Sequence, residues 1–374
     1  MGAWSDNNMS GDGCLVMHKE QSVYKGLFEN NQYSEFGKLY CGTESESGSG
    51  KSEYYVGEFF NNKRSGGGKL YEVENVGMVD QELLVNEVGM VIIDNTTSSS
   101  IIMSVEGVYK AQLVYEGDWM DGEMSGHGTR ILPDGSSYTG PLIRNLPNGS
   151  DGVCNYGDGS KYIGQWRNGL RNGVGTYTTA KQEEYNGKWV ADQRCGKGEW
   201  KSLLTGETYT GLWQNHTPHG YGVRVYSDKN EYTGDFINGQ RHGVGTMVYK
   251  NTVTTTSNTN TNIAPGASTY SGDWFMDQRH GVGKWIATGM SASTNANKNN
   301  ANNAANNFYN GGLANNSTTN STTNTLKISI NNTDYEISYD GEWHSDKRNG
   351  QGVARYLSGN NYTGLYEEDE PKPF

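Results

Sequence analysis

Six arginines recur in one local pattern, Arg-x-Gly-x-Gly, and they offer this chain a repeated group that can bind anions. A guanidinium binds phosphate and carboxylate oxygens through paired N–H donors, so a row of such groups favours phosphoinositide head groups or an acidic partner. Acidic residues stand two positions before three of them, at Asp192, Asp277 and Asp346, which gives the alternative that the surface neutralises itself through exposed ion pairs. Both interpretations stay open. The six members are Arg64, Arg171, Arg194, Arg241, Arg279 and Arg348.

Two other patterns suggest chemistry that their context argues against. Three histidines occupy the position after the one that holds the arginines: His219, His242 and His280. Each hairpin contributes two strands and one histidine, so the histidines lie roughly 10 Å apart, too far for a single metal ion. Residues 48–52, Gly-Ser-Gly-Lys-Ser, end like a phosphate loop, yet the first glycine of that motif is missing and a strand pattern follows. No kinase, hydrolase or zinc-protease motif is present. We therefore expect no enzyme activity, no cofactor and no bound metal.

The elements that position these residues are copies of one β-hairpin, seen most clearly over residues 162–177. Tyr162, Gly164 and Trp166 alternate, so they share one face of a strand. Asn168-Gly169 supplies a two-residue turn. Glycines on the returning strand leave flat backbone on which an aromatic ring of a neighbour can lie. A single hairpin is marginally stable in water, so the copies must stack.

The hairpin recurs along most of the chain, with steps of 23 or 24 residues between Tyr115 and Tyr232. Such a period is typical of repeat architectures. The first tyrosine of each copy is Tyr24, Tyr55, Tyr115, Tyr138, Tyr162, Tyr185, Tyr209, Tyr232, Tyr270, Tyr339 or Tyr362. A large apolar residue follows four positions later, at Phe28, Phe59, Trp119, Leu142, Trp166, Trp189, Trp213, Phe236, Trp274, Trp343 and Tyr366.

The pattern Tyr-x-Gly-x-Trp-x-x-Gly-x-x-x-Gly-x-Gly closely resembles the MORN (membrane occupation and recognition nexus) repeat, over roughly three quarters of the chain. The resemblance implies an all-β fold, an elongated single-layer array of antiparallel hairpins. In similar proteins, such as junctophilins and radial spoke head proteins, the repeats are associated with membrane contact or cytoskeletal assembly. Other relatives carry the repeats beside phosphatidylinositol-phosphate kinase or methyltransferase domains, but those catalytic parts are absent here.

Composition limits the partners and the compartment. The chain has 52 glycines and 25 tyrosines with 33% hydrophobic residues, which suits a thin aromatic-faced sheet rather than a thick core. A formal net charge of −12 argues against nucleic acid and against general binding to anionic membranes. Four cysteines without a Cys-x-x-Cys pair indicate neither disulfides nor zinc. We expect a cytoplasmic protein, with membrane or cytoskeletal association possible through local sites.

The organisation along the chain follows from where the period is kept and where it breaks. We predict N-terminal repeats over residues 1–70, the first of them partial, an inserted hairpin over 71–114, and a continuous array over 115–250. Low-complexity segments at 251–269 and 287–324, rich in Asn and Thr, are predicted to be disordered. A further repeat spans 270–286, and residues 325–374 hold a hairpin, a repeat, a half repeat and an acidic tail. The repeat at Tyr138 carries an extra residue before Gly152, which predicts a local kink.

The aromatic face is the second candidate surface, because Tyr and Trp are enriched at interaction surfaces, although the same rings also have to form the core. The candidate rings are Tyr115, Trp119, Tyr162, Trp166, Tyr185, Trp189, Tyr209, Trp213, Tyr270 and Trp274. The favoured hypothesis is a non-catalytic adaptor for a protein partner. The alternatives are a peripheral membrane protein that binds phosphoinositides through the arginine row and a regulatory subunit of a separate phosphatidylinositol-phosphate kinase. The oligomeric state stays open.

Overall fold

The computed structural model describes residues 2–17, 22–41, 52–75, 91–93, 100–104, 107–250, 268–287, 336–356 and 358–372. It divides into two compact units, residues 1–181 with 188–192 and residues 182–187 with 193–374. Every regular element in the described ranges is a strand. The prediction of an all-β array of antiparallel hairpins is therefore confirmed. Apart from their end residues, the two low-complexity segments lie outside the described residues. So does the first strand, residues 326–330, of the hairpin predicted before the Tyr339 repeat, whereas its second strand, residues 335–339, falls from residue 336 onward in a described strand, Glu336–His344.

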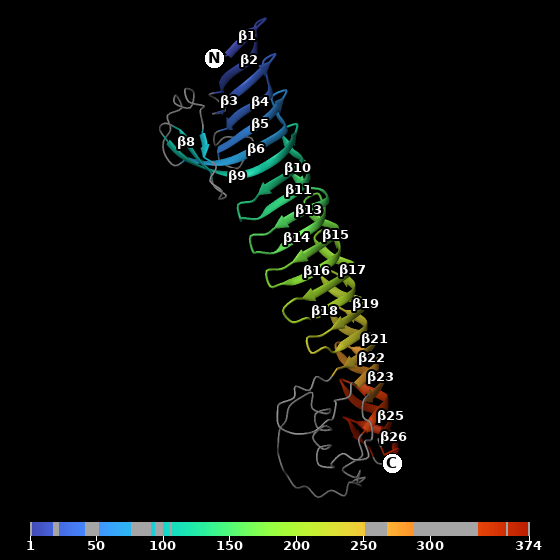
Figure 1. Ribbon diagram of the computed structural model, residues 1–374. Helices are drawn as coiled ribbons and strands as arrows, with labels where there is room; N and C mark the ends of the chain where they lie inside the picture. The colour runs from blue at the N-terminus through green and yellow to red at the C-terminus, as the bar shows by residue number, and fades with distance from the viewer. Residues whose placement is uncertain are drawn as a thin grey trace. The chain divides into compact units, whose positions relative to one another are not determined.

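The first unit is a succession of antiparallel hairpins (Figure 1). Strands β1 to β6 pair in chain order, and the array continues from β6 to β9, β10, β11, β13, β14 and β15. Its strands are β1 (Gly2–Ser5), β2 (Asn8–Met17), β3 (Ser22–Glu29), β4 (Gln32–Cys41), β5 (Ser52–Phe60), β6 (Lys63–Asn75), β7 (Val91–Ile93), β8 (Ser100–Ser104), β9 (Gly107–Met120), β10 (Glu123–Ile131), β11 (Ser137–Ile143), β12 (Leu146–Pro147), β13 (Gly149–Asn155), β14 (Lys161–Arg167) and β15 (Leu170–Thr178).

Two irregular features of this unit occur where the sequence breaks the period. The insertion at 71–114 contains the predicted hairpin, since Ile92 of β7 pairs with Ile102 of β8, and β8 pairs in turn with the long strand β9. In the Tyr138 repeat the register of β13 against β14 shifts between Gly149 and Gly152. This shift is the predicted kink, because the extra residue has to leave the ladder as a bulge.

The second unit repeats the same arrangement with its strands paired in chain order from β17 to β27. Strand β16 (Glu183–Val190) is divided between the two units at residue 187. The strands of the second unit are β17 (Gln193–Ser202), β18 (Thr208–Gln214), β19 (Thr217–Val225), β20 (Glu231–Ile237), β21 (Gln240–Tyr249), β22 (Ser268–Phe275), β23 (Gln278–Ala287), β24 (Glu336–His344), β25 (Lys347–Tyr356), β26 (Asn361–Glu367) and β27 (Glu370–Pro371).

The core of each hairpin is a tyrosine ring lying on a pair of glycines. Gly164 and Gly175 are directly opposite in the ladder, and a Cβ built on Gly175 would stand 2.2 Å from the Tyr162 hydroxyl oxygen. The same hydroxyl donates a hydrogen bond of 3.0 Å to the Gln165 carbonyl. The ring on the glycine pair thus belongs to the same hairpin, and the prediction that a neighbour's ring lies there was wrong.

Tryptophans join successive hairpins. Trp189 lies edge-on to Tyr162 of the preceding repeat, with ring centroids 5.5 Å apart and an interplanar angle of 82°. Its indole N–H donates to the carbonyl of Gly175, at 3.1 Å. Edge-to-face rings of this kind add about 0.5–1.5 kcal/mol per pair beyond the area they bury. Stacking therefore supplies the stability that a single hairpin lacks.

Candidate functional site

The arginine row lies on the aromatic face of the sheet. Within its hairpin the arginine lies directly opposite the large apolar residue of the same repeat in the ladder, as Arg171 does opposite Trp166 and Arg241 opposite Phe236. Its guanidinium then extends over the aromatic ring of the next repeat. The guanidinium carbon of Arg241 is 4.3 Å from the centroid of the Trp274 ring, and that of Arg171 is 4.4 Å from Trp189. The row is thus a set of cation–π contacts between repeats.

The same arginines form ion pairs with the turn of the following repeat. The Arg241 Nε donates to Asp277 Oδ1 at 3.0 Å, its Nη2 donates to the Asp277 carbonyl at 2.6 Å, and its backbone N–H donates to the same Oδ1 at 3.0 Å. Arg279 repeats this arrangement with Asp346. The aspartates are therefore paired with the arginine one repeat earlier, not with the arginine two residues after them in the chain. Equivalent pairs are Arg171 with Asp192 and Arg348 with Asp369.

These contacts leave the guanidinium groups partly covered. The side chains of Arg171, Arg241 and Arg279 are 19%, 18% and 23% exposed. Arg64 stands over Trp119 and pairs with Glu53, and Arg194 stands over Trp213. The self-neutralising ion pairs that the sequence offered as an alternative are present, but each aspartate meets the arginine of the preceding repeat instead of the one two residues after it. The paired arginines are Arg64, Arg171, Arg241, Arg279 and Arg348.

The amino acid at the turn of each repeat depends on the residue that it contacts in the preceding repeat. In every case its backbone N–H donates to the carbonyl of that residue. Where that residue is Met or Tyr, the turn residue is Asn, whose Oδ1 accepts the N–H, as Asn145 does from Met124 at 2.8 Å. Where it is Pro, which has no N–H to donate, the turn residue is Gly. The Asn cases are Asn31 with Met9, Asn62 with Tyr33 and Asn145 with Met124. The Gly cases are Gly169 with Pro147 and Gly239 with Pro218.

Where the residue met is Arg, the turn residue is Asp in four cases, and Arg64 and Arg194 are the two exceptions. The turn residue that meets Arg64 is Gly122, and the one that meets Arg194 is His216. Each donates its backbone N–H to the carbonyl of that arginine, but neither is an aspartate. The rule therefore describes four of the six arginines. It was missed in the sequence analysis because its two members lie in different repeats.

The candidate aromatic face is the core of the array. Its ten rings are between 0% and 7% exposed, with Tyr162 at 0% and Trp166 at 7%. Rings so deeply buried have almost no surface to offer a partner. A direct binding role for them is therefore not supported by this geometry.

Burial also sets the protonation of the core. Removal from water raises the pKa of Tyr209 to about 12, and it raises that of Tyr162 to about 12 even though the Arg171 guanidinium acts in the opposite direction. Burial likewise raises the pKa of the Cys154 thiol above its ordinary value. Tyr209, Tyr162 and Cys154 are therefore neutral at physiological pH and do not act there as phenolate or thiolate nucleophiles.

The histidines do not come together as a metal site. His280 lies near His344, with ring centroids 5.0 Å apart, and near Phe275 at 5.7 Å. His242 approaches Phe275 from the other side, at 5.2 Å. Over the described ranges, no cluster of three His, Cys, Asp or Glu side chains is arranged to hold a metal ion.

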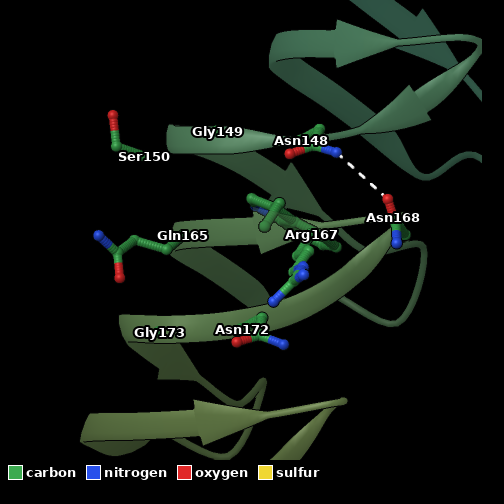
Figure 2. Close-up of a pocket in the computed structure, with 9 residues that line it drawn as sticks. Asn148, Gly149, Ser150, Gln165, Arg167, Asn168, Asn172 and Gly173 are labelled. Atoms are coloured by element: carbon green, nitrogen blue, oxygen red, sulfur yellow. Dashed lines mark hydrogen bonds between the residues drawn. The ribbon is translucent and has the colours of Figure 1, made fainter.

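A small open hollow lies beside the bulge of the Tyr138 repeat. Figure 2 shows Asn148, Gln165, Asn168 and Asn172 around it, and the Asn148 amide donates to Asn168 Oδ1 at 3.4 Å. Ser150, Trp166, Arg167 and two glycines complete the lining. No carboxylate, imidazole or thiol stands among these lining residues, so the hollow offers no acid–base pair for catalysis.

The face opposite the aromatic core exposes apolar side chains in a regular row. In the second unit Tyr221 is 59%, Val244 65% and Val282 61% exposed, and each occupies the same position of its repeat. Each is also directly opposite an acidic residue of the next strand, at Asp235, Asp273 and Glu342 respectively. We call these six residues the outer row. The sequence signal for its apolar members, which was missed, is the residue between the last two glycines of each repeat.

Comparison with known proteins agrees with the hairpin period. The MORN repeat description matches residues 55–71, 115–137, 162–182, 185–202, 209–231, 232–252, 270–289 and 339–361. No curated protein matches the chain. In the part of the chain that the structure describes, no helix is long and apolar enough to cross a membrane.

Proposed function

Because the chain belongs to the MORN repeat family, we propose that it is a non-catalytic scaffold that binds a protein partner through the face of its sheet opposite the aromatic core. The arginine row and the aromatic rings hold neighbouring repeats together in this structure. The apolar side chains of the outer row do not hold repeats together in this way, since they are about 60% exposed. Exposed apolar groups that recur at one position of successive repeats are typical of an interaction surface.

The single observation that carries the proposal is that Tyr221, Val244 and Val282 each lie directly opposite an acidic residue of the following strand. Cross-strand neighbours share one face of a sheet. Within the hairpins the register partners of Asp235 and Asp273 are His242 and His280. Asp273 Oδ2 nevertheless accepts the Val282 N–H at 2.9 Å, so the acidic and apolar members also meet inside that hairpin, and one extended partner can contact the row.

The phosphoinositide alternative stays a prediction, and the geometry gives it less support. The guanidinium groups of Arg171, Arg241 and Arg279 already donate to carboxylates and lie over aromatic rings. A lipid phosphate would have to replace these contacts.

The test is affinity capture from cells that express the chain naturally, with proteins quantified for two matched variants. In the first, Tyr221, Val244 and Val282 are each changed to Thr, a residue that keeps the strand preference of the sheet. In the control, Leu203 and Leu204, which are 56% and 71% exposed in a connection outside the row, are changed to Thr. Partners kept by the control and lost from the Thr variant would support the proposal. Identical partner sets for the two variants would contradict it.

A further inference from the structure

The outer row has a regular spacing that constrains what can bind it. From β19 to β24 the residues are Tyr221, Asp235, Val244, Asp273, Val282 and Glu342, one per strand. Neighbouring strands lie about 4.8 Å apart, so apolar groups recur about every 9.6 Å with an acidic group about halfway between them. All six residues belong to the second unit.

We propose that the outer row binds an extended basic segment of a partner protein that carries an apolar residue at every third position and Lys or Arg between them. This inference rests on the proposed function and names the partner class for it. In the polyproline II conformation three residues advance about 9.3 Å and every third side chain points the same way. That repeat matches the spacing of Tyr221, Val244 and Val282.

Charge complementarity selects a basic segment. The carboxylates of Asp235, Asp273 and Glu342 alternate with the apolar groups, and the whole chain carries a net charge of −12. Asp273 Oδ2 accepts the backbone N–H of Val282 at 2.9 Å. A carboxylate has about four acceptor positions, so this bond leaves capacity for an incoming ammonium or guanidinium.

The other charged groups on this face do not reverse its sign. Lys284 stands directly opposite Asp340 in the ladder, so a carboxylate accompanies this ammonium group. His242 and His280 stand opposite Asp235 and Asp273 within their hairpins, and Phe275 lies between the two imidazoles and is 46% exposed. Phe275 extends the apolar part of the surface toward the turns.

The probes are capped synthetic peptides of about five Leu-Lys-Pro repeats, a length of about 46 Å that exceeds the outer row, with fluorescence anisotropy against the full chain. Three peptides are compared: Leu-Lys-Pro, Leu-Glu-Pro, and a peptide of Leu-Lys-Pro composition in which the leucines no longer fall at every third position. We expect the first peptide to bind, and to bind several-fold more weakly at about 0.15 M salt than at about 0.01 M, because the shorter Debye length screens exposed charges.

Matched variants locate the binding. The row variant has Asp235→Asn, Asp273→Asn and Glu342→Gln, which keep the shape and the acceptor oxygen. The control variant removes three carboxylates of the same unit elsewhere, with Asp228→Asn, Glu367→Gln and Glu370→Gln. Loss of three exposed ion pairs corresponds to roughly a tenfold weaker affinity. We expect that loss for the row variant and little change for the control.

The outcomes separate the inference from the proposed function. Equal binding of the shuffled peptide would overturn the spacing, and equal or tighter binding of Leu-Glu-Pro would overturn the basic character. No peptide binding, with partners still lost from the Thr variant described above, would overturn the inference and leave the proposed function standing. No peptide binding and no partner loss would overturn both. A self-association of the chain that the row variant abolishes would assign the row to a second copy and also overturn the inference.

Discussion

The pairing of Arg241 with Asp277, the turn aspartate of the next repeat, predicts a measurable coupling between two residues that are 36 positions apart. The perturbation is a double-mutant cycle with Arg241→Met and Asp277→Asn. The double variant reproduces a pair that the chain already uses elsewhere, since Met124 meets Asn145 in the same geometry. The double variant therefore has a native precedent and is expected to fold.

The magnitude follows from the contacts. The Asp277 side chain is 44% exposed, so the ion pair is worth about 1 kcal/mol rather than the value of a buried pair. The guanidinium carbon of Arg241 also lies 4.3 Å from the Trp274 ring centroid, a contact worth about 0.5–1 kcal/mol at a partly exposed site. Arg241→Met should then cost about 1.5–2 kcal/mol and Asp277→Asn about 1 kcal/mol. The double variant should cost about as much as Arg241→Met alone, since the ion pair is lost only once.

The assay is amide hydrogen exchange at the backbone N–H groups of Arg241 and Asp277, which bond to Asp277 Oδ1 and to the Arg241 carbonyl respectively. Local exchange suits a repeat array because repeats can open without global unfolding. The control cycle replaces Asp277→Asn by Asp134→Asn, because Asp134 caps the Ser136 N–H in a different turn. Costs that simply add for Arg241 and Asp277, within about 0.5 kcal/mol, would refute the reasoning.

Three further predictions follow. Gly68→Ala should destabilise the chain by about 2 kcal/mol or more, since its Cβ would stand 2.2 Å from the Tyr55 hydroxyl oxygen, whereas Gly67→Ala, with its nearest contact at 3.6 Å, should change the melting temperature little. Equal shifts for the two neighbours would contradict the packing of that ring. Burial raises the pKa of Tyr209 from 10.0 to about 12, so its contribution to stability should be constant below pH 10 and fall as the pH rises toward about 12. Circular dichroism with tyrosinate absorbance checks this, and ionisation of all tyrosines near pH 10 without unfolding would be inconsistent with it. In liposome flotation at about 0.15 M salt, phosphoinositide should not increase the flotation of the intact chain, because guanidinium groups such as that of Arg171 are already paired. Flotation that needs both the lipid and the arginines, tested by changing Arg171, Arg194, Arg241 and Arg279 to Ser, would instead favour the membrane alternative.

The sequence alone determined the hairpin and its period. A Tyr-x-Gly-x-Trp strand, a two-residue turn and a Gly-x-Gly strand leave few local arrangements, because alternation places Tyr162, Gly164 and Trp166 on one face and the turn closes only with positive φ. The bulge before Gly152 was predictable for the same local reason, since one extra residue cannot stay in register.

Only the tertiary structure decided which groups meet between repeats. Asp277 is two residues from Arg279 in the chain, yet it binds Arg241, because the turn of each repeat donates its backbone N–H to the repeat before and carries its side chain to the same place. Stacking therefore joins residues by repeat number rather than by proximity in sequence. The same stacking buries the aromatic rings that the sequence suggested as a binding face, and it leaves Tyr221, Val244 and Val282 exposed beside carboxylates on the other side.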